Sequence, residues 1–98
     1  MTLLQLLYFE TLARVLHYTR AAEELHISQP SLSYSIAELE KELGVSLFKR
    51  EKRKIALTPY GERFLPYVKK TMALLEEGKA TLRQMKDKAC LLYTSPSP

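Results

Sequence analysis

The sequence predicts a mostly α-helical fold with three short helices, a two-stranded β hairpin and a long fourth helix. Three observations predict it: apolar residues recur every three or four positions over most of the chain, a short segment near its middle alternates instead, and helix-capping residues precede several of the helical runs. We expect one small domain over residues 1–58, a linker helix over residues 59–89 and a segment of different character over residues 90–98.

The first two helices are expected to be short. Residues 3–16 are apolar on nearly every side, and the expected core contacts are Phe9, Leu12, Ala13 and Leu16. The second helix is the run RAAEELH, with Thr19 as its N-cap and two small alanines that let another helix approach closely. The segment HIS, residues 26–28, is its only connection to the next helical run. Two short helices joined in this way form a helix-turn-helix pattern.

The third helix is expected within the stretch SQPSLSYSIAELEKELG, residues 28–44. Ser28 suits the N-cap, Pro30 the first turn and Gly44 the left-handed residue that ends a helix. Its buried stripe consists of Leu32, Ile36, Leu39 and Leu43. Another face carries small hydrogen-bonding groups where a solvated face usually carries Glu and Lys, which favours close approach to a polar surface.

A β hairpin and the fourth helix are expected to follow. Apolar residues flank the basic run KREKRK on both sides, which predicts two short strands around a charged tip. Thr58 and Pro59 then suit the N-cap and first position of a long helix. Its heptad-spaced residues, interrupted by Lys79, are Leu65, Val68, Met72, Leu75 and Leu82. A helix of about 45 Å outruns a small domain, so we expect this seam to form a homodimer; the alternative is packing on its own domain.

The positive charge of the chain is confined to one place. The net charge is +4, and the run KREKRK alone holds five basic residues and one acidic residue, so the remaining charges cancel. Such a local excess is the footprint that phosphate backbones attract. Taken alone, an ordinary solvated basic loop explains it equally well.

Composition argues against several classes of function. The 98 residues, 46% of them hydrophobic, allow one small domain, and we expect it to be cytoplasmic because no long apolar run or basic-then-apolar leader suggests membrane insertion or export. One cysteine makes no internal disulfide, and His17 and His26 lack partners at metal-ligand spacing. No nucleophile–base pair or glycine-rich phosphate loop is present, so we do not expect an enzyme.

The last nine residues, CLLYTSPSP, differ from what precedes them. They match the translation of a nucleotide sequence that resembles a transposase adapter used in sequencing libraries. We interpret them as non-native read-through at the end of a fragment. A natural Ser/Pro-rich end is the competing interpretation.

Three segments together resemble the N-terminal DNA-binding domain of the bacterial LysR-type transcriptional regulators: LLYF, TRAAEELHISQPSLSYSIAELEKELGVSLFKR and LTPYGE. The resemblance covers residues 1–89 and implies a winged helix-turn-helix followed by a dimerising linker helix. In that family a separate effector domain, absent here, is expected to take a small-molecule co-inducer. No cofactor is implied for residues 1–89.

The resemblance also implies which residues contact double-stranded DNA, as a homodimer on an interrupted inverted repeat. They are Arg20, Ser28, Gln29, Pro30, Ser31, Ser33, Tyr34, Ser35, Arg50, Lys52, Arg53, Lys54 and Thr58. Two residues depart from the family pattern: Tyr34 stands where many relatives place a long polar residue, and Lys52 where a small turn residue is common. The alternatives are a protein-interaction module with a basic loop and a winged-helix regulator of another family.

Overall fold

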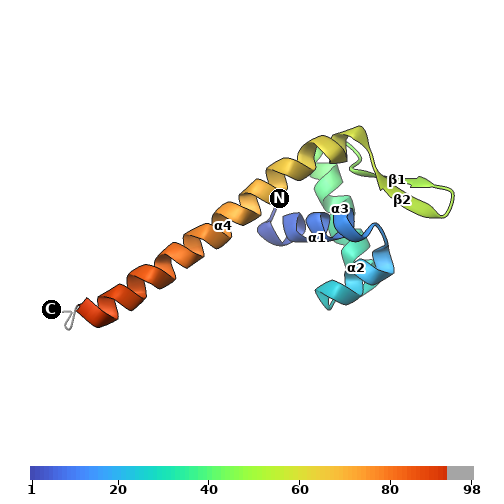
Figure 1. Cartoon of the computed structure of the whole chain (residues 1–98). Coiled ribbons are helices and arrows are strands. Elements are labelled where there is room, and N and C mark those ends of the chain that lie inside the picture. The colour runs from blue at the N-terminus through green and yellow to red at the C-terminus, as the bar shows by residue number, and fades with distance from the viewer. Residues whose placement is uncertain (93–98) are drawn as a thin grey trace.

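A computed structural model describes the backbone of residues 1–92 and the side chains of residues 1–88. Its elements are α1 (Leu3–Val15), α2 (Tyr18–Leu25), α3 (Gln29–Leu43), β1 (Phe48–Glu51), β2 (Lys54–Leu57) and α4 (Pro59–Leu92). The three short helices cluster together, the hairpin extends from the domain near the beginning of α4, and α4 runs away from the cluster as a long rod (Figure 1). The molecule is consequently elongated, 62 Å by 26 Å by 20 Å. This arrangement confirms the predicted fold class.

The core joins all the helices to the base of the hairpin. Its largest fully buried side chains are Phe9, Leu12, Leu32, Ile36, Leu39, Leu47 and Val68, and α2 contributes the fully buried Ala21. The ring of Phe9 on α1 lies 5.5 Å from both the Phe48 ring on β1 and the Phe64 ring on α4, centroid to centroid. Aromatic contacts at this separation are favourable beyond the area that they bury. One side chain of α1 therefore holds the hairpin and the long helix together.

The connection between α1 and α2 differs from the sequence prediction. Leu16 adopts a left-handed conformation with φ of 56° and ends α1, so its side chain is 38% exposed and the expected core contact is wrong. The N-cap of α2 is His17, whose Nδ1 accepts from the Arg20 N–H at 3.2 Å. Thr19 therefore lies inside the helix and the predicted cap is wrong. Phe9, Leu12 and Ala13 are buried as predicted.

The third helix begins and ends where its punctuation predicts. The Ser28 hydroxyl accepts from the Ser31 N–H at 3.2 Å, and Pro30 occupies the first turn. Gly44 adopts φ of 77°, in the left-handed region, and its N–H donates to the Glu40 carbonyl at 2.8 Å. The predicted cap, first turn and stop of α3 are confirmed.

The hairpin is shorter than the apolar pattern suggested. β1 and β2 pair antiparallel, from Phe48 opposite Leu57 to Glu51 opposite Lys54, which leaves a two-residue loop. The first loop residue, Lys52, has φ of 58°, the region that such tight hairpin loops require. The chain before Phe48 is not paired to β2, although its residues are β-prone.

The first turn of α4 packs against the chain that connects α3 to β1. The Thr58 hydroxyl accepts from the Gly61 N–H at 3.1 Å, which confirms Thr58 at the helix start, and donates to the Ser46 carbonyl at 2.5 Å. Gly61 packs so closely that a Cβ there would lie 2.3 Å from the Leu47 carbonyl oxygen. Only glycine fits this contact.

The predicted seam of α4 divides into two parts. Val68 is 1% exposed inside the domain core, so its expected contact with a second copy is wrong, because its surface is already covered by its own domain. Leu65 and Met72 are partly buried against the same core. Beyond them Leu75 is 39% exposed and Leu82 66%. The alternative of intramolecular packing therefore describes the first part of the seam.

The predicted boundary between residues 89 and 90 falls inside α4, which continues to Leu92. The side chains of residues 89–98 lie outside the described residues, so the adapter interpretation stays a prediction. No helix in the described part combines the length and the apolar character needed to cross a membrane.

Candidate nucleic-acid interface

The polar face of α3 is directed away from the core. Ser28, Gln29, Pro30 and Ser31 are exposed, whereas Ser33 and Ser35 are half-buried. Tyr34 is 67% exposed, the largest side chain on this face. The fold leaves these groups uncovered because the stripe of Leu32, Ile36 and Leu39 directs the opposite side of the helix inward. The first two turns of α3 therefore present a polar, nearly uncharged surface.

Two serines at the start of α3 share one hydrogen bond. The Ser28 hydroxyl donates to the Ser31 hydroxyl at 2.9 Å while it accepts the Ser31 N–H. A hydroxyl has a single proton to donate. The proton of Ser28 is thus engaged, and the Ser31 hydroxyl is the donor that remains for an external acceptor.

The wing, defined as residues 48–57 of β1, β2 and their loop, carries the basic residues. Arg50, Lys52, Arg53 and Lys54 are all exposed. Lys49 pairs with Glu51 at 3.7 Å, and no other ion pair involves the wing among the side chains described. Four cations are therefore left for an external anion.

The wing and α3 meet at one hollow of about 170 Å³. Its polar lining comes from His17, Thr19, Gln29, Arg50 and Arg53, with no carboxylate among the lining residues. Two cations and the first residue of α3 therefore border the same space. We call residues 28–35 of α3, together with the wing, the α3–wing surface.

Two other predicted contacts lie beside this surface. Arg20 is exposed in the first turn of α2. Thr58 is half-buried, and its hydroxyl proton is given to the Ser46 carbonyl. To bind the Thr58 hydroxyl, a phosphate would have to replace the Ser46 carbonyl as its acceptor. The Arg20 guanidinium makes no ion pair among the described side chains, so a phosphate there would displace no internal ion pair.

A carboxylate on α3 ties the wing to the helix. One Glu40 oxygen accepts from the Leu47 N–H at 2.7 Å and from the Phe48 N–H at 3.2 Å. This contact holds the beginning of β1 against α3. Burial raises the pKa of Tyr18, the nearby Glu40 carboxylate raises it further, and Arg50 of the wing opposes them. Sequence reasoning missed Glu40, because nothing local distinguishes it from its neighbouring glutamates.

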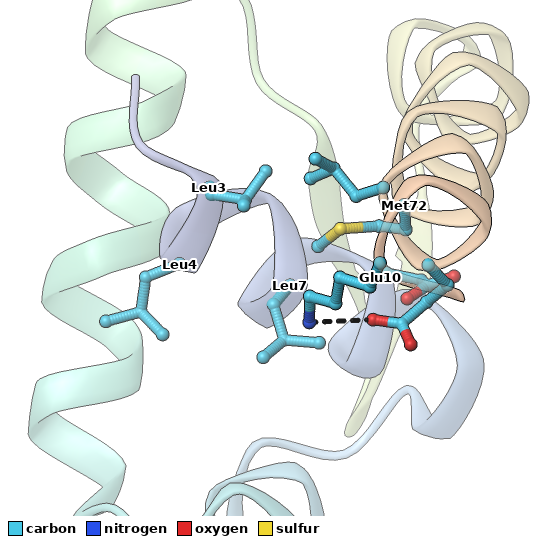
Figure 2. A pocket seen from close by; sticks show the side chains of 8 residues that line it. Leu3, Leu4, Leu7, Glu10 and Met72 are labelled. Atoms are coloured by element: carbon cyan, nitrogen blue, oxygen red, sulfur yellow. Dashed lines mark hydrogen bonds and ion pairs between the residues drawn. The ribbon is translucent and has the colours of Figure 1, made fainter. Parts of the chain in front are cut away.

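A second exposed feature lies between α1 and α4, and we call it the α1–α4 groove. It has a volume of about 520 Å³ and is lined by Leu3, Leu4, Leu7, Glu10, Met72, Leu75, Glu76 and Lys79. Figure 2 shows Leu3, Leu4 and Leu7 of α1 together with Met72 of α4. On α4, the Lys79 ammonium pairs with the Glu76 carboxylate at 3.0 Å. The α1 leucines were not predicted as an interface. The sequence did contain a signal for this groove, since the first helix is apolar on nearly every side and one core cannot cover all of it.

Among the side chains that the structure describes, His, Cys, Asp and Glu do not gather in groups of three or more that could hold an ion.

Comparison with known proteins identifies the family to which the chain belongs. Residues 3–62 match the model of the bacterial regulatory helix-turn-helix proteins of the lysR family. The chain is 51% identical over 81 residues to an uncharacterized HTH-type transcriptional regulator, YybE, of Bacillus subtilis, and 51% identical over 87 residues to the Hca operon transcriptional activator HcaR of Escherichia coli. It covers 28% of the length of each, while 83% and 88% of this chain are matched.

Solved structures agree with the match in sequence. The crystal structure of the BenM DBD/catB site 1 DNA complex superimposes with a TM-score of 0.84 at 34% identity, over 88% of this chain and 96% of that chain. Corynebacterium glutamicum OxyR in its oxidized form gives 0.77 at 44% identity, over 83% of this chain and 26% of that one. The chain belongs to the lysR family of bacterial regulatory helix-turn-helix proteins.

Proposed function

We propose that this chain is a sequence-reading DNA-binding domain that acts as a homodimer in transcription regulation and has no catalytic activity. The observation that carries the proposal is the shared hollow at which Gln29 of α3 meets Arg50 and Arg53 of the wing. A helix that reads bases and cations that bind phosphates must face the same duplex. The residues that line this hollow come from both α3 and the wing. The BenM domain, to which 88% of this chain is similar, was solved with DNA.

In this proposal α3 enters the major groove. That groove admits one helix, and polar side chains near the helix start reach the edges of the bases. Gln29 has an amide for base edges, Pro30 an apolar ring for a thymine methyl, and Ser31 a free hydroxyl donor. Tyr34, at 67% exposure, offers apolar or stacking contact in place of a long polar side chain. The half-buried Ser33 and Ser35 are short enough to let the helix approach closely.

The cations supply affinity to the same complex. Arg50, Lys52, Arg53 and Lys54 would follow the backbone or enter the adjacent minor groove, where charge and groove width matter more than base identity. Arg20 and the region of Thr58 would contact further phosphates. Contacts of this kind position a protein without specifying sequence, and they weaken as salt rises.

The homodimer is supported by the α1–α4 groove and the exposed part of α4. Leu3 and Leu4 are 49% and 54% exposed, and Leu75 is 39% exposed. A second copy of α4 offers a matching apolar ridge that includes Leu82, and Met72 lines the groove it would occupy. A two-fold arrangement of two α3 helices would read an interrupted inverted repeat. Binding to chromosomal DNA would place the protein in the cytoplasm.

Selection from random duplex DNA by this chain, repeated over a series of salt concentrations, tests the proposal. We expect enrichment of an interrupted inverted repeat whose preference over random DNA persists as salt rises. Binding without enrichment that falls uniformly with salt would contradict sequence reading. Enrichment of a single half-site would contradict the dimer and leave α3 as the reader. No binding to any duplex would favour the alternative of a protein-interaction module.

A further inference from the structure

The wing is joined to its neighbours by hydrogen bonds on two sides of its base. On one side the Thr58 N–H donates to the Leu47 carbonyl at 3.0 Å, which holds the base to the start of α4. On the other side one Glu40 oxygen accepts from the Leu47 and Phe48 N–H groups. Within the described residues, these two are the only hydrogen bonds between α3 and the base of the wing. Glu40 alone therefore supplies the directional contact between α3 and the wing.

The geometry of the Glu40 bonds suits a contact that fixes orientation. The Leu47 and Phe48 nitrogens lie 2.7 Å and 3.2 Å from the same oxygen, distances ordinary for N–H···O bonds. A carboxylate oxygen has two lone pairs and can accept both. Two bonds to consecutive amides fix the orientation of the peptide between them as well as its position. Glu40 is half-buried, so water competes for its oxygen less than at an exposed site.

Apolar packing at the base of the wing does not provide the same restraint. The Phe48 ring lies 5.5 Å from the Phe9 ring, centroid to centroid, and Leu47 is buried. Such packing is non-directional. Beyond Phe48 both strands project from the domain (Figure 1). Because a strand rises about 3.3 Å per residue, a small rotation at Phe48 produces a larger displacement at Arg50 and Arg53.

The charge of Glu40 indicates that it does not bind DNA itself. Burial raises the pKa of the Tyr18 phenol, the Glu40 carboxylate raises it further and the Arg50 guanidinium lowers it, so both charges lie near this phenol. No ion pair joins Glu40 to Arg50 among the described side chains, which leaves Arg50 for a phosphate. A carboxylate beside DNA-binding arginines repels phosphate. A contribution of Glu40 to DNA affinity must therefore come through its hydrogen bonds.

We propose that Glu40 is a positioning residue whose two hydrogen bonds hold the wing beside α3, so that Arg50 and Arg53 face the DNA backbone while α3 occupies the groove. A segment that is already held in its bound orientation loses less conformational freedom on binding. The inference rests on the proposed function, because it requires the wing to contact DNA. It goes beyond that function in assigning a role in DNA affinity to an acidic side chain outside the predicted contact set.

Two charge-matched comparisons test this role. Glu40→Gln and Glu40→Ala both remove the charge, but only Gln keeps an oxygen that can accept the two N–H groups. The parent chain and Glu40→Asp both keep the charge, but Asp withdraws the oxygen by one methylene. Fluorescence anisotropy measures the Kd of each protein for the selected site and for a random duplex.

The losses are expected on both duplexes, because phosphate contacts carry no base information. Glu40→Ala should bind about three- to tenfold more weakly than Glu40→Gln, the cost of ordering a wing that is no longer held. Glu40→Asp should bind about two- to fivefold more weakly than the parent chain for the same reason. Equal affinities of Glu40→Ala and Glu40→Gln would overturn the inference.

A double-variant cycle shows whether Glu40 acts through the wing. In a background with Arg50→Ala and Arg53→Ala, a fixed wing brings fewer cations to the DNA. The ratio of Kd between Glu40→Ala and Glu40→Gln should therefore shrink toward one in that background. An unchanged ratio would overturn the inference, since Glu40 would then act on α3 or on folding and not on the wing.

Folding is measured separately from binding. Amide hydrogen exchange at Leu47 and Phe48 should be slow in the parent chain and in Glu40→Gln and faster in Glu40→Ala. Exchange that stays slow in Glu40→Ala would overturn the inference, because the base of the wing would be held without Glu40. Affinities are compared at temperatures at which every variant is folded. If Glu40→Ala does not fold, the parent chain and Glu40→Asp decide, and equal affinity of these two overturns the inference.

Failure of the inference differs from failure of the proposed function. A parent chain that binds no duplex would overturn both. A parent chain that binds DNA without selecting a sequence would contradict sequence reading, yet the random duplex would still decide the role of Glu40. A parent chain that selects a site, with Glu40→Ala and Glu40→Gln indistinguishable on it, would overturn the positioning role alone.

Discussion

The α3–wing surface and the α1–α4 groove are both exposed, yet their chemistry is opposite. The first carries hydroxyls, amides and four cations, and several of its polar groups are held in place by internal hydrogen bonds. The second is lined mainly by leucines and Met72, with Glu76 and Lys79 paired at its edge. One small domain thus has a hydrogen-bonding face and an apolar face.

This difference indicates different partners. A polar, cationic face keeps its groups hydrated until a partner of complementary charge replaces the water, and its contribution depends on salt. An exposed apolar groove gains free energy, roughly 25 cal/mol per Å² of apolar area, when another apolar surface covers it. The α3–wing surface therefore suits a nucleic acid, and the groove suits a second copy of the chain.

The largest effect is expected from removing cations of the α3–wing surface. Replacing Arg50 and Arg53 together with Ala should weaken binding to all duplexes about a hundredfold, roughly 1.4 kcal/mol for each charge. Two lost phosphate contacts should also reduce the slope of log affinity against log salt by about 1.8. Fluorescence anisotropy over a salt series measures both. A loss confined to the selected site would contradict a backbone role for the wing.

Self-association through the α1–α4 groove should weaken when a charge is introduced into the groove. Leu75→Glu places a carboxylate against the groove and should weaken self-association by at least tenfold, because burying it unpaired is unfavourable. Leu74→Glu is the matched control, since Leu74 is 65% exposed and does not line the groove. Sedimentation equilibrium of both variants measures the change. Equal loss in both would contradict the groove as the site of association.

The hydrogen bonds by which Glu40 of α3 holds the beginning of the wing should contribute measurably to the free energy of unfolding. Glu40→Ala leaves the Leu47 and Phe48 N–H groups without their acceptor. Two partly buried donors left unsatisfied should lower the free energy of unfolding by about 1–3 kcal/mol. Urea unfolding measures it, with Lys41→Ala as the control, because Lys41 is exposed on the same helix and makes no ion pair among the described side chains. Equal effects in both variants would contradict the tie.

Base reading should change discrimination rather than stability. Gln29→Ala should relax the preference at one base step of each half-site by about 1–2 kcal/mol, because one amide–base pairing is lost. The binding of random DNA and its salt slope should stay near those of the parent chain. A uniform loss of affinity on all sequences would make Gln29 a backbone contact instead.

The smallest effect is expected at alkaline pH, where the phenol of Tyr18 on α2 ionises. Burial raises the pKa of its phenol above the ordinary value near 10. Below that value Tyr18 is protonated in both folded and unfolded chains, so it adds no pH dependence. Above it the unfolded chain ionises first, and the parent should lose stability relative to Tyr18→Phe, by less than about 1 kcal/mol at pH 10.5. Urea unfolding at pH 8 and pH 10.5 tests this.

Local patterns in the sequence predicted the helices well because their signals lie within a few residues. The Ser28 and Gly44 ends of α3 depend on one turn of backbone each, and the structure confirms them. Of the predicted buried stripe, Leu32, Ile36 and Leu39 are buried, whereas Leu43 is partly buried. The hairpin around the basic run followed from alternation and charge. The exposed polar face of α3 could also be predicted, since a stripe that is buried leaves the opposite face outward.

The remaining features depend on which elements meet. Val68 has the spacing of an intermolecular seam, yet α4 lies against the Phe9 core and covers it. Leu16 is apolar, but the left-handed turn that ends α1 directs it outward. Glu40 looks like an ordinary surface residue until α3 meets the wing. Spacing along the chain thus determined the helices and their polar and apolar faces, whereas contacts between residues distant in sequence decided which apolar residues are covered and which polar groups are held in place.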